Sequence, residues 1–225
     1  MEKAKVDFKK VNLLYATTPV YSLDIQYAVF DNHTGGNLVE QKFGQYVKNR
    51  LLSYTKILGI ETVVNEKRTV IVNNEDRAII ITDTRKIELS PIQTNMDTLL
   101  KLCKSIKVKD LGVSERYYSF DFGDDESSEF SKIEVYINLS NYSIKKMVMF
   151  YNQSMPLTQN DFYAKEKKPR LEITYKAFTK LTSANEELFT ESSYIMMADN
   201  TYRGKGKYSN YKIINQLQSA RFKKK

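Results

Sequence analysis

The sequence predicts an antiparallel α+β domain. Most of the chain alternates apolar and polar residues with the period of half-buried strands, in about nine or ten short segments, and only two segments have helical spacing. Helices and strands do not alternate in the manner of a βαβ protein, and no repeat of fixed period is present. With 225 residues, 41% of them hydrophobic, the chain is long enough to form a sizeable core.

The N-terminal part predicts one helix followed by two strands. Apolar residues recur at helical spacing over residues 4–16, and the alternating segment 20–31 follows as a strand. The Asn- and Gly-rich segment 31–37 is typical of a turn. Residues 38–57 are then expected to form a second strand that bends near Gly44.

Three short β-branched runs, Thr62–Val64, Thr69–Val72 and Ala78–Thr82, are separated by polar turns and predict a β-meander. Helical spacing returns from about Met96 to Ile106.

The alternation of apolar and polar residues then resumes, which predicts a group of further strands. These strands are expected at residues 117–122, 132–138, 143–151 and 170–178, with a polar loop over 154–168.

The positive charge is concentrated at the C-terminus. The net charge is +8, and from Asp199 onward the chain has eight Lys or Arg residues and one acidic residue, so this segment carries +7 of the total. We therefore expect a domain over residues 1–198 and a basic C-terminal tail over 199–225. Residues 211–222 have the spacing of a short amphipathic helix.

The tail has four possible roles: docking on a protein partner, lying on an anionic membrane surface, stacking on single-stranded nucleic acid, or remaining solvated. Nucleic-acid binding has the weakest support of these. The candidate docking residues are Arg203, Lys205, Lys207, Tyr208, Tyr211, Lys212, Arg221 and Phe222.

No set of residues in the sequence predicts catalysis. Cys103 is the only cysteine, so no internal disulfide can form. His33 is the only histidine, and the sequence lacks the further residues that a histidine-based triad or a zinc site requires. Five carboxylates lie between Asp121 and Glu129, but their spacing differs from a calcium-binding EF-hand loop and is typical of a solvated turn. We expect a non-enzymatic protein without metal or cofactor.

Nothing in the sequence predicts a membrane-spanning segment. No run approaches the ~18 apolar residues that a spanning helix needs. The N-terminal segment has no apolar stretch of the kind found in signal peptides. The protein is therefore expected either to be cytosolic or to have lost a signal peptide.

Several segments resemble the LolA/LolB-like lipoprotein carrier family, and the order of elements is similar over most of residues 5–195. The closest local likeness is a late strand, a linker and a Leu-Phe pair. The segments are FGQYVKN (43–49), ETVVNEKRTVIV (61–72), SKIEVYINLSNYSIKKMVMF (131–150), RLEITYKAF (170–178) and ANEELF (184–189).

This resemblance implies a strongly curved antiparallel sheet, an incomplete β-barrel, with helices lidding its open side. It implies a monomeric periplasmic carrier, with its signal peptide removed, that holds acyl chains of lipid or lipoprotein in the concave face during protein transport in the cell envelope. The alternative is an interaction subunit of an envelope or secretion assembly that docks through the basic tail. Strand alternation gives the expected cavity lining as Phe43, Val47, Val70, Val72, Ile79, Ile81, Ile133, Val135, Ile137, Leu171, Ile173 and Tyr175.

Overall fold

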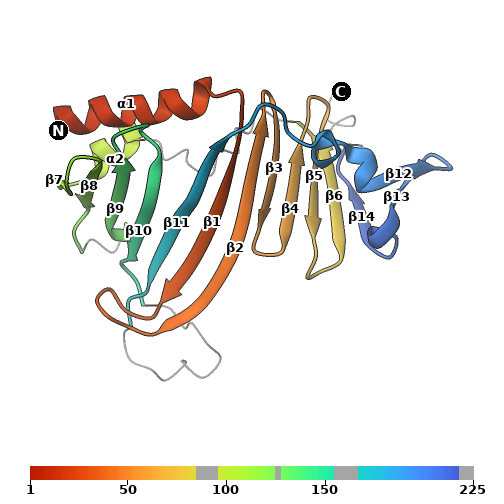
Figure 1. Cartoon of the computed structure of the whole chain (residues 1–225). Helices are drawn as coiled ribbons and strands as arrows, with labels where there is room; N and C mark the ends of the chain where they lie inside the picture. Colours follow the sequence, from red (N-terminus) through yellow and green to blue (C-terminus); the bar gives the residue numbers. More distant parts are fainter. Residues whose placement is uncertain (85–95, 125–127, 155–166, 218–225) are drawn as a thin grey trace, which may run out of the picture. The chain divides into compact units, whose positions relative to one another are not determined.

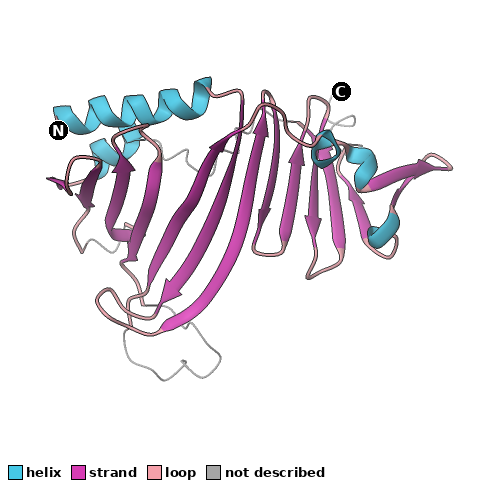
Figure 2. Cartoon of the chain, viewed as in Figure 1, coloured by secondary structure: helices cyan, strands magenta, loops and turns pink. Residues whose placement is uncertain are grey.

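The structure is a computed structural model that describes residues 1–84, 96–124, 128–154 and 167–217 (Figure 1). Within these residues the chain is mainly β-sheet, with two α-helices and three short 3-10 helices (Figure 2). Twelve strands are hydrogen-bonded in one sheet, whose order begins at β14 (Lys212–Asn215) and ends at β7 (Ser105–Asp110). The sheet is mainly antiparallel, but β14 lies parallel to β6 (Ala78–Asp83). The predicted α+β class with a large antiparallel sheet is confirmed.

The chain folds as two compact units, each assembled from segments that are separated in the sequence. Unit 1 consists of Met1–Thr18, Asp24–Phe43 and Ile92–Phe178, and unit 2 of Pro19–Leu23, Gly44–Pro91 and Thr179–Lys225. The strands β1 (Val20–Phe30) and β2 (Leu38–Asn49) each contribute to both units. The expected boundary at residue 198 does not coincide with this division.

Unit 1 contains both α-helices, and its strands follow one another in the order β1-β11-β10-β9-β8-β7. Its elements besides β1 and β7 are α1 (Glu2–Thr17), α2 (Met96–Leu102), β8 (Glu115–Asp121), β9 (Phe130–Asn138), β10 (Ile144–Tyr151) and most of β11 (Arg170–Lys180). The predicted first helix and the four late strands are confirmed. The second helix ends earlier than expected, because residues from Ser105 onward pair with β8 as strand β7.

Helix α1 packs on the sheet of unit 1 through one stripe of side chains. Ala4, Phe8, Val11 and Tyr15 recur at helical spacing, and all four are at most 6% exposed. The Phe8 ring lies 5.1 Å from the ring of Tyr118 on β8. This stripe therefore fixes which face of the sheet α1 covers.

Unit 2 contains the β-meander and the C-terminal elements. These are β3 (Leu52–Ile57), β4 (Ile60–Val64), β5 (Arg68–Asn73), β6, η2 (Glu186–Phe189), η3 (Glu191–Ser193), β12 (Ile195–Ala198), β13 (Thr201–Gly204), η4 (Gly206–Tyr208) and β14. The meander is confirmed, since β4, β5 and β6 pair antiparallel in sequence order. The single strand expected over 38–57 is wrong: a turn at Arg50, whose φ is 56°, separates β2 from β3.

The C-terminal segment is folded into unit 2 as far as it is described. β12 and β13 form a separate hairpin, and β14 is paired with β6, with Ile213 opposite Ile79. The amphipathic helix expected over 211–222 is therefore wrong for residues 212–215, which are a strand. A strand forms here in place of a helix because these residues pair with β6. The pairing begins where Lys212 donates its backbone N–H to the carbonyl of Arg77.

A candidate ligand-binding face in unit 1

One face of the unit 1 sheet, which we call the α1 face, is defined by Met147 and Met149 on β10 and by Leu171, Ile173 and Tyr175 on β11. The strand register places Met147 opposite Ile173 and Met149 opposite Leu171. The Tyr175 hydroxyl lies 3.7 Å from Sδ of Met147. Because side chains alternate along a strand, these five residues share one side of the sheet.

Burial on the α1 face changes along the strands. Near α1, Met147 is 2% and Tyr175 is 6% exposed. Further from α1 the side chains of Met149, Leu171 and Ile173 are only partly buried, and we call these three the open stretch. The open stretch is apolar surface that is only partly buried, and such surface is available to an apolar ligand.

The covered end of the face is closed by Tyr15 of α1. Its hydroxyl oxygen accepts a hydrogen bond of 3.1 Å from the backbone N–H of Ile144, at the start of β10. Its ring meets the ring of Phe178 edge-on, with centroids 5.4 Å apart. Burial raises the pKa of Tyr15 to about 12, although the hydrogen bond from Ile144 works in the opposite direction. Burial likewise raises the pKa of Tyr27 on β1 to about 12.

A buried polar network attaches α1 to β8. Asp7 is 4% exposed, and one of its carboxylate oxygens, Oδ2, accepts hydrogen bonds from Arg116 at 2.5 Å and from the Tyr118 hydroxyl at 2.6 Å. Arg116 also donates through Nε to Asp110, at the end of β7, at 2.5 Å. Burial, followed by the hydrogen bond to Asp7, raises the pKa of Tyr118. The network fixes α1 in a single position on the sheet.

A small apolar cavity lies beside α2. Its volume is about 250 Å³, and its walls include Leu99 and Leu102 of α2, Phe122 after β8, and Phe130 and Ile133 of β9. Ligand cavities of drug-sized molecules are typically ~300–1,000 Å³. The cavity by itself would hold only part of an acyl chain.

The predicted lining residues of unit 1 are brought together by the sheet, and they differ in access. Ile133, Val135 and Ile137 on β9 are each at most 4% exposed, whereas Leu171 and Ile173 belong to the open stretch.

The sequence reasoning missed Met149. The run from Met147 to Tyr151 is apolar at almost every position and shows no alternation. The sequence therefore could not indicate which of these side chains lie on the same side of the sheet as Leu171 and Ile173 of β11.

The predicted lining residues of unit 2 lie in a packed core. Val47, Val70, Val72, Ile79 and Ile81 are all at most 4% exposed, and the side chains that cover them come from the C-terminal segment. The covering residues are Phe189, Tyr194, Ile195 and Tyr208. In this arrangement the five predicted residues have no free surface to offer a ligand.

Phe43 on β2 does not line a cavity either. The residue is 61% exposed, and the ammonium of Lys176 on β11 lies 4.8 Å from the centroid of its ring.

The tail residues proposed for docking are distributed between core and surface. Tyr208 is 3% exposed, and its hydroxyl lies 3.4 Å from the buried carboxylate of Glu61, so it is not available for docking. The Tyr211 hydroxyl donates a hydrogen bond of 3.1 Å to Asn74.

The basic residues of the tail that the structure describes are exposed to solvent. Lys205, Lys207 and Lys212 are exposed, and the Arg203 side chain is 61% exposed beside Asp199. Arg221 and Phe222 lie outside the described residues.

The remaining sequence candidates have structural contacts. Burial raises the pKa of the Cys103 thiol, whose sulfur lies 3.7 Å from the carbonyl oxygen of Leu100. Asp121 accepts a hydrogen bond of 2.8 Å from the backbone N–H of Gly123, the pattern of a local turn. In the described part of the chain, no group of three or more His, Cys, Asp or Glu side chains is arranged to hold a metal ion.

Residues 36–189 match the model of a protein family described as "Sporulation protein YdcC-like". The chain belongs to the YdcC-like family of sporulation proteins. The matched region includes the open stretch on β10 and β11 and the whole meander of unit 2. A comparison with curated proteins found no match.

Solved structures similar to this YdcC-like chain share little sequence with it. An uncharacterized conserved protein from Thermus thermophilus is 9% identical with a TM-score of 0.49, and the likeness covers 95% of this chain and 99% of that one. A LolA superfamily protein from Nitrosomonas europaea is 12% identical with a TM-score of 0.33, over 84% and 98% of the two chains. A DUF1329 family protein from Desulfovibrio piger is 8% identical with a TM-score of 0.38, over 84% and 98%. The predicted LolA-like resemblance is thus found among solved structures, and it concerns the fold alone.

No helix in the described part of this YdcC-like chain combines the length and the apolar character that crossing a membrane requires.

Proposed function

We propose that this YdcC-like protein is a non-enzymatic binding protein of the cell envelope in sporulating cells, and that it holds an acyl chain of a lipid or lipoprotein against the open stretch of unit 1. The observation that carries the proposal is the change in burial along β10 and β11. Met147 and Tyr175 are buried, at 2% and 6% exposure, while Met149, Leu171 and Ile173 on the same face are only partly buried.

The chemistry of the open stretch suits an alkyl chain. A thioether and two branched aliphatic side chains offer no hydrogen bond, and methionine adapts to irregular apolar shapes. Burying each methylene of an acyl chain contributes about 0.8 kcal/mol, so several methylenes in contact are enough for measurable binding. A single chain gives only marginal, reversible attachment, which suits a protein that must release what it carries.

The location of the site in unit 1 refines the prediction made from the sequence. There the lining was expected to include the meander of unit 2, but those side chains pack against Phe189, Tyr194, Ile195 and Tyr208 of the same chain. Enclosing a ligand in unit 2 would require removing that C-terminal cover. Unit 1 needs no such rearrangement, because its apolar surface is already exposed.

The decisive experiment is native mass spectrometry with solvent extraction on protein purified from its own envelope fraction. We expect a lipid or acylated peptide bound at about one per chain. A clean unliganded mass, with the protein also failing to bind added short-chain lipid, would refute the proposal. A stoichiometric protein partner found instead would favour the interaction subunit considered from the sequence.

A matched pair of variants locates the site. Ile173→Asp places a charge in the open stretch, and we expect it to abolish lipid binding because an ionised carboxylate is costly to bury against hydrocarbon. Thr174→Asp introduces the same charge one residue later on the opposite side of the sheet, where it faces Lys146 of the neighbouring strand. The control should fold and bind lipid as the parent does. Equal loss of binding in both variants would show that the effect is not specific to the α1 face.

A further inference from the structure

The side of helix α1 that is turned away from the sheet of unit 1 carries two exposed apolar residues between lysines. Val6 is 45% and Leu13 is 59% exposed. They are seven residues apart, so they lie on one side of the helix, opposite its buried stripe. The same spacing places two lysines on each flank of this pair. We call this set the outer face of α1: Val6 and Leu13, Lys5 and Lys9 on one flank, and Lys3 and Lys10 on the other.

The exposed side chains of α1 have a net positive charge. The helix contains four lysines and two acidic residues, Glu2 and Asp7. Asp7 is buried and is bound by Arg116, so Glu2 is the one acidic side chain that α1 exposes. Four positive charges against one negative charge give +3 on a helix of 16 residues. Such a surface attracts anions.

Most of this charge is not neutralised within the chain. Lys5 and Lys9 are exposed and make no ion pair with any residue that the structure describes. The ammonium of Lys10 donates a hydrogen bond of 2.7 Å to the hydroxyl of Tyr142, which is neutral and leaves the charge uncompensated. Lys3 alone of the four is paired within the described chain, with Asp110 at 3.1 Å. Three of the four ammonium groups are therefore available to an anionic partner.

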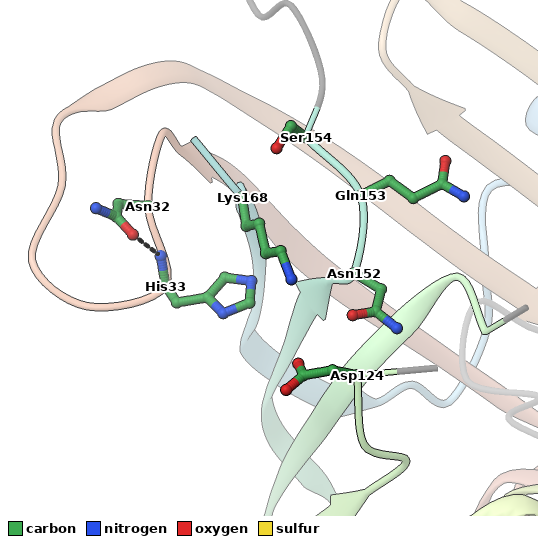
Figure 3. A pocket seen from close by; sticks show the side chains of 7 residues that line it. All are labelled: Asn32, His33, Asp124, Asn152, Gln153, Ser154 and Lys168. Carbon is green, nitrogen blue, oxygen red and sulfur yellow. Dashed lines mark hydrogen bonds between the residues drawn. The ribbon is translucent and has the colours of Figure 1, made fainter. Parts of the chain in front are cut away.

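Other charged groups of unit 1 lie next to charges of opposite sign. Glu172 on β11 pairs with Lys146 at 2.6 Å and with Arg170 at 2.8 Å. In the polar pocket of about 660 Å³ that Figure 3 shows, Lys168 and Asp124 contribute one charge of each sign. The outer face of α1 lacks this balance, and its preference is for anions.

The turn between β7 and β8 adds apolar surface beside the first turn of α1. The ion pair of Lys3 with Asp110, the last residue of β7, connects the two segments. The turn is closed by a hydrogen bond of 2.8 Å from the backbone N–H of Leu111 to the carbonyl of Glu115. Val113 within it is 98% exposed. A basic helix thus adjoins a turn that presents an apolar side chain to solvent.

The composition of the outer face favours a lipid surface over a protein or a nucleic acid. Protein interfaces are depleted in lysine and enriched in aromatic residues and arginine, and single-stranded nucleic acids stack on aromatic rings. The outer face has four lysines and neither an aromatic residue nor an arginine. Long lysine stems can lie along apolar groups while their ammonium groups reach lipid phosphates.

We propose that the outer face of α1, together with the β7–β8 turn, docks on an anionic membrane surface. The helix lies in the plane of the interface, where its lysines contact lipid phosphates and Val6, Leu13 and Val113 enter the headgroup layer. This surface is separate from the open stretch, and docking does not depend on the acyl chain proposed there.

The test is flotation of the full chain with two kinds of vesicle, phosphatidylcholine alone and phosphatidylcholine with about one-third phosphatidylglycerol. We expect the chain to float with the anionic vesicles only. Raising the ionic strength from about 0.1 M to about 1 M shortens the screening length from ~10 Å to ~3 Å and should release the protein.

Two variants test the charged and the apolar parts of the face. Lys5→Gln with Lys9→Gln removes two unpaired charges and keeps good helix formers. Each lysine near an anionic surface contributes about fivefold in affinity, so this double variant should bind anionic vesicles about twentyfold more weakly. Leu13→Ser should weaken binding by at least about threefold while leaving its salt dependence unchanged.

The matched control takes the same charge from another surface. Lys205→Gln with Lys212→Gln removes two exposed lysines of the C-terminal tail in unit 2, and it should bind anionic vesicles as the parent does. Ile173→Asp, which alters only the open stretch, should also bind them normally. Equal weakening by the two lysine variants would show that net charge rather than the outer face is responsible.

The remaining outcomes separate docking from acyl-chain binding. If Ile173→Asp abolishes flotation and Lys5→Gln with Lys9→Gln does not, the vesicles are held through the open stretch and the docking proposal fails. If the chain floats with neither kind of vesicle but binds a short-chain lipid in solution, docking is refuted and the acyl site stands. If polyglutamate binds as tightly as the anionic vesicles and Leu13→Ser changes neither affinity, the outer face is a site for acidic polymers and not for a membrane.

Discussion

Replacing Arg116 with methionine should weaken the attachment of α1 to the sheet of unit 1 more than replacing any exposed residue of that helix. Arg116 donates to Asp7 through Nη1 at 2.5 Å and to Asp110 through Nε at 2.5 Å. Its side chain is 14% exposed and that of Asp7 only 5%. Arg116→Met keeps the apolar stem and leaves the Asp7 carboxylate buried with one remaining donor, the Tyr118 hydroxyl.

The expected cost follows from which partners are buried. Breaking a buried ion pair by removing one partner costs about 3–5 kcal/mol, because the other charge is left uncompensated. The contact with Asp110, whose side chain is half exposed, adds little because water screens it. Because Arg116 itself retains some contact with water, we take the lower end and expect Arg116→Met to lower the free energy of unfolding by about 3 kcal/mol.

The double variant Asp7→Leu with Arg116→Met is the matched control. It removes both charges, and the Tyr118 hydroxyl still has the carbonyl of Lys3 at 3.5 Å. We expect it to recover most of the loss, since apolar replacements of a buried pair are often neutral or stabilising. Urea unfolding followed by circular dichroism measures both variants. If the double variant were as unstable as the single one, the uncompensated charge of Asp7 would not be the cause, and the reasoning would be refuted.

Two further predictions concern unit 2 and the aromatic residues of unit 1. Gly204→Ala should destabilise unit 2 by about 2 kcal/mol, because a Cβ at that position would lie 1.8 Å from the carbonyl oxygen of Tyr208. Gly206→Ala, two residues later, meets nothing within 4 Å and should cost only the roughly 1 kcal/mol of a left-handed backbone at φ 58°; equal urea midpoints for the two would contradict this account. Tyr15 and Tyr27 should ionise at about pH 12 in the folded protein rather than near 10, as seen by absorbance at alkaline pH. Since their folded pKa is raised, the stability they contribute is complete below about pH 10 and is lost as the pH rises through 12. Tyr27→Phe should therefore reduce the alkaline loss of stability, and an unchanged profile would count against it.

Local patterns in the sequence were enough to predict the elements that are formed by neighbouring residues. The stripe of Ala4, Phe8, Val11 and Tyr15 follows from helical spacing, and all four are buried in α1. The meander follows from short β-branched runs separated by polar turns. Such elements depend on interactions within a few residues, so the information for them is present in each segment.

Other elements were missed because their local signals were ambiguous. The turn at Arg50 has neither glycine nor proline, yet Arg50 adopts a φ of 56°, so nothing in the sequence marked the break between β2 and β3. Strand β7 was hidden because its first residues, Ser105 and Ile106, continue the apolar spacing of the preceding helix. In both cases, hydrogen bonding to a neighbouring strand decided the conformation.

The candidate site shows the same division between sequence and structure. Strand alternation in the sequence was sufficient to select Leu171, Ile173 and Tyr175 as one apolar face of β11. Only the tertiary structure decided that Tyr175 is sealed near α1 while Leu171 and Ile173 stay partly exposed, because that depends on where a helix from the other end of the chain lies. It also decided that Tyr208 covers the meander, through contact with Glu61, which is 147 residues away. Contacts at such separations cannot be inferred from local periodicity, because they depend on how the chain closes its long loops.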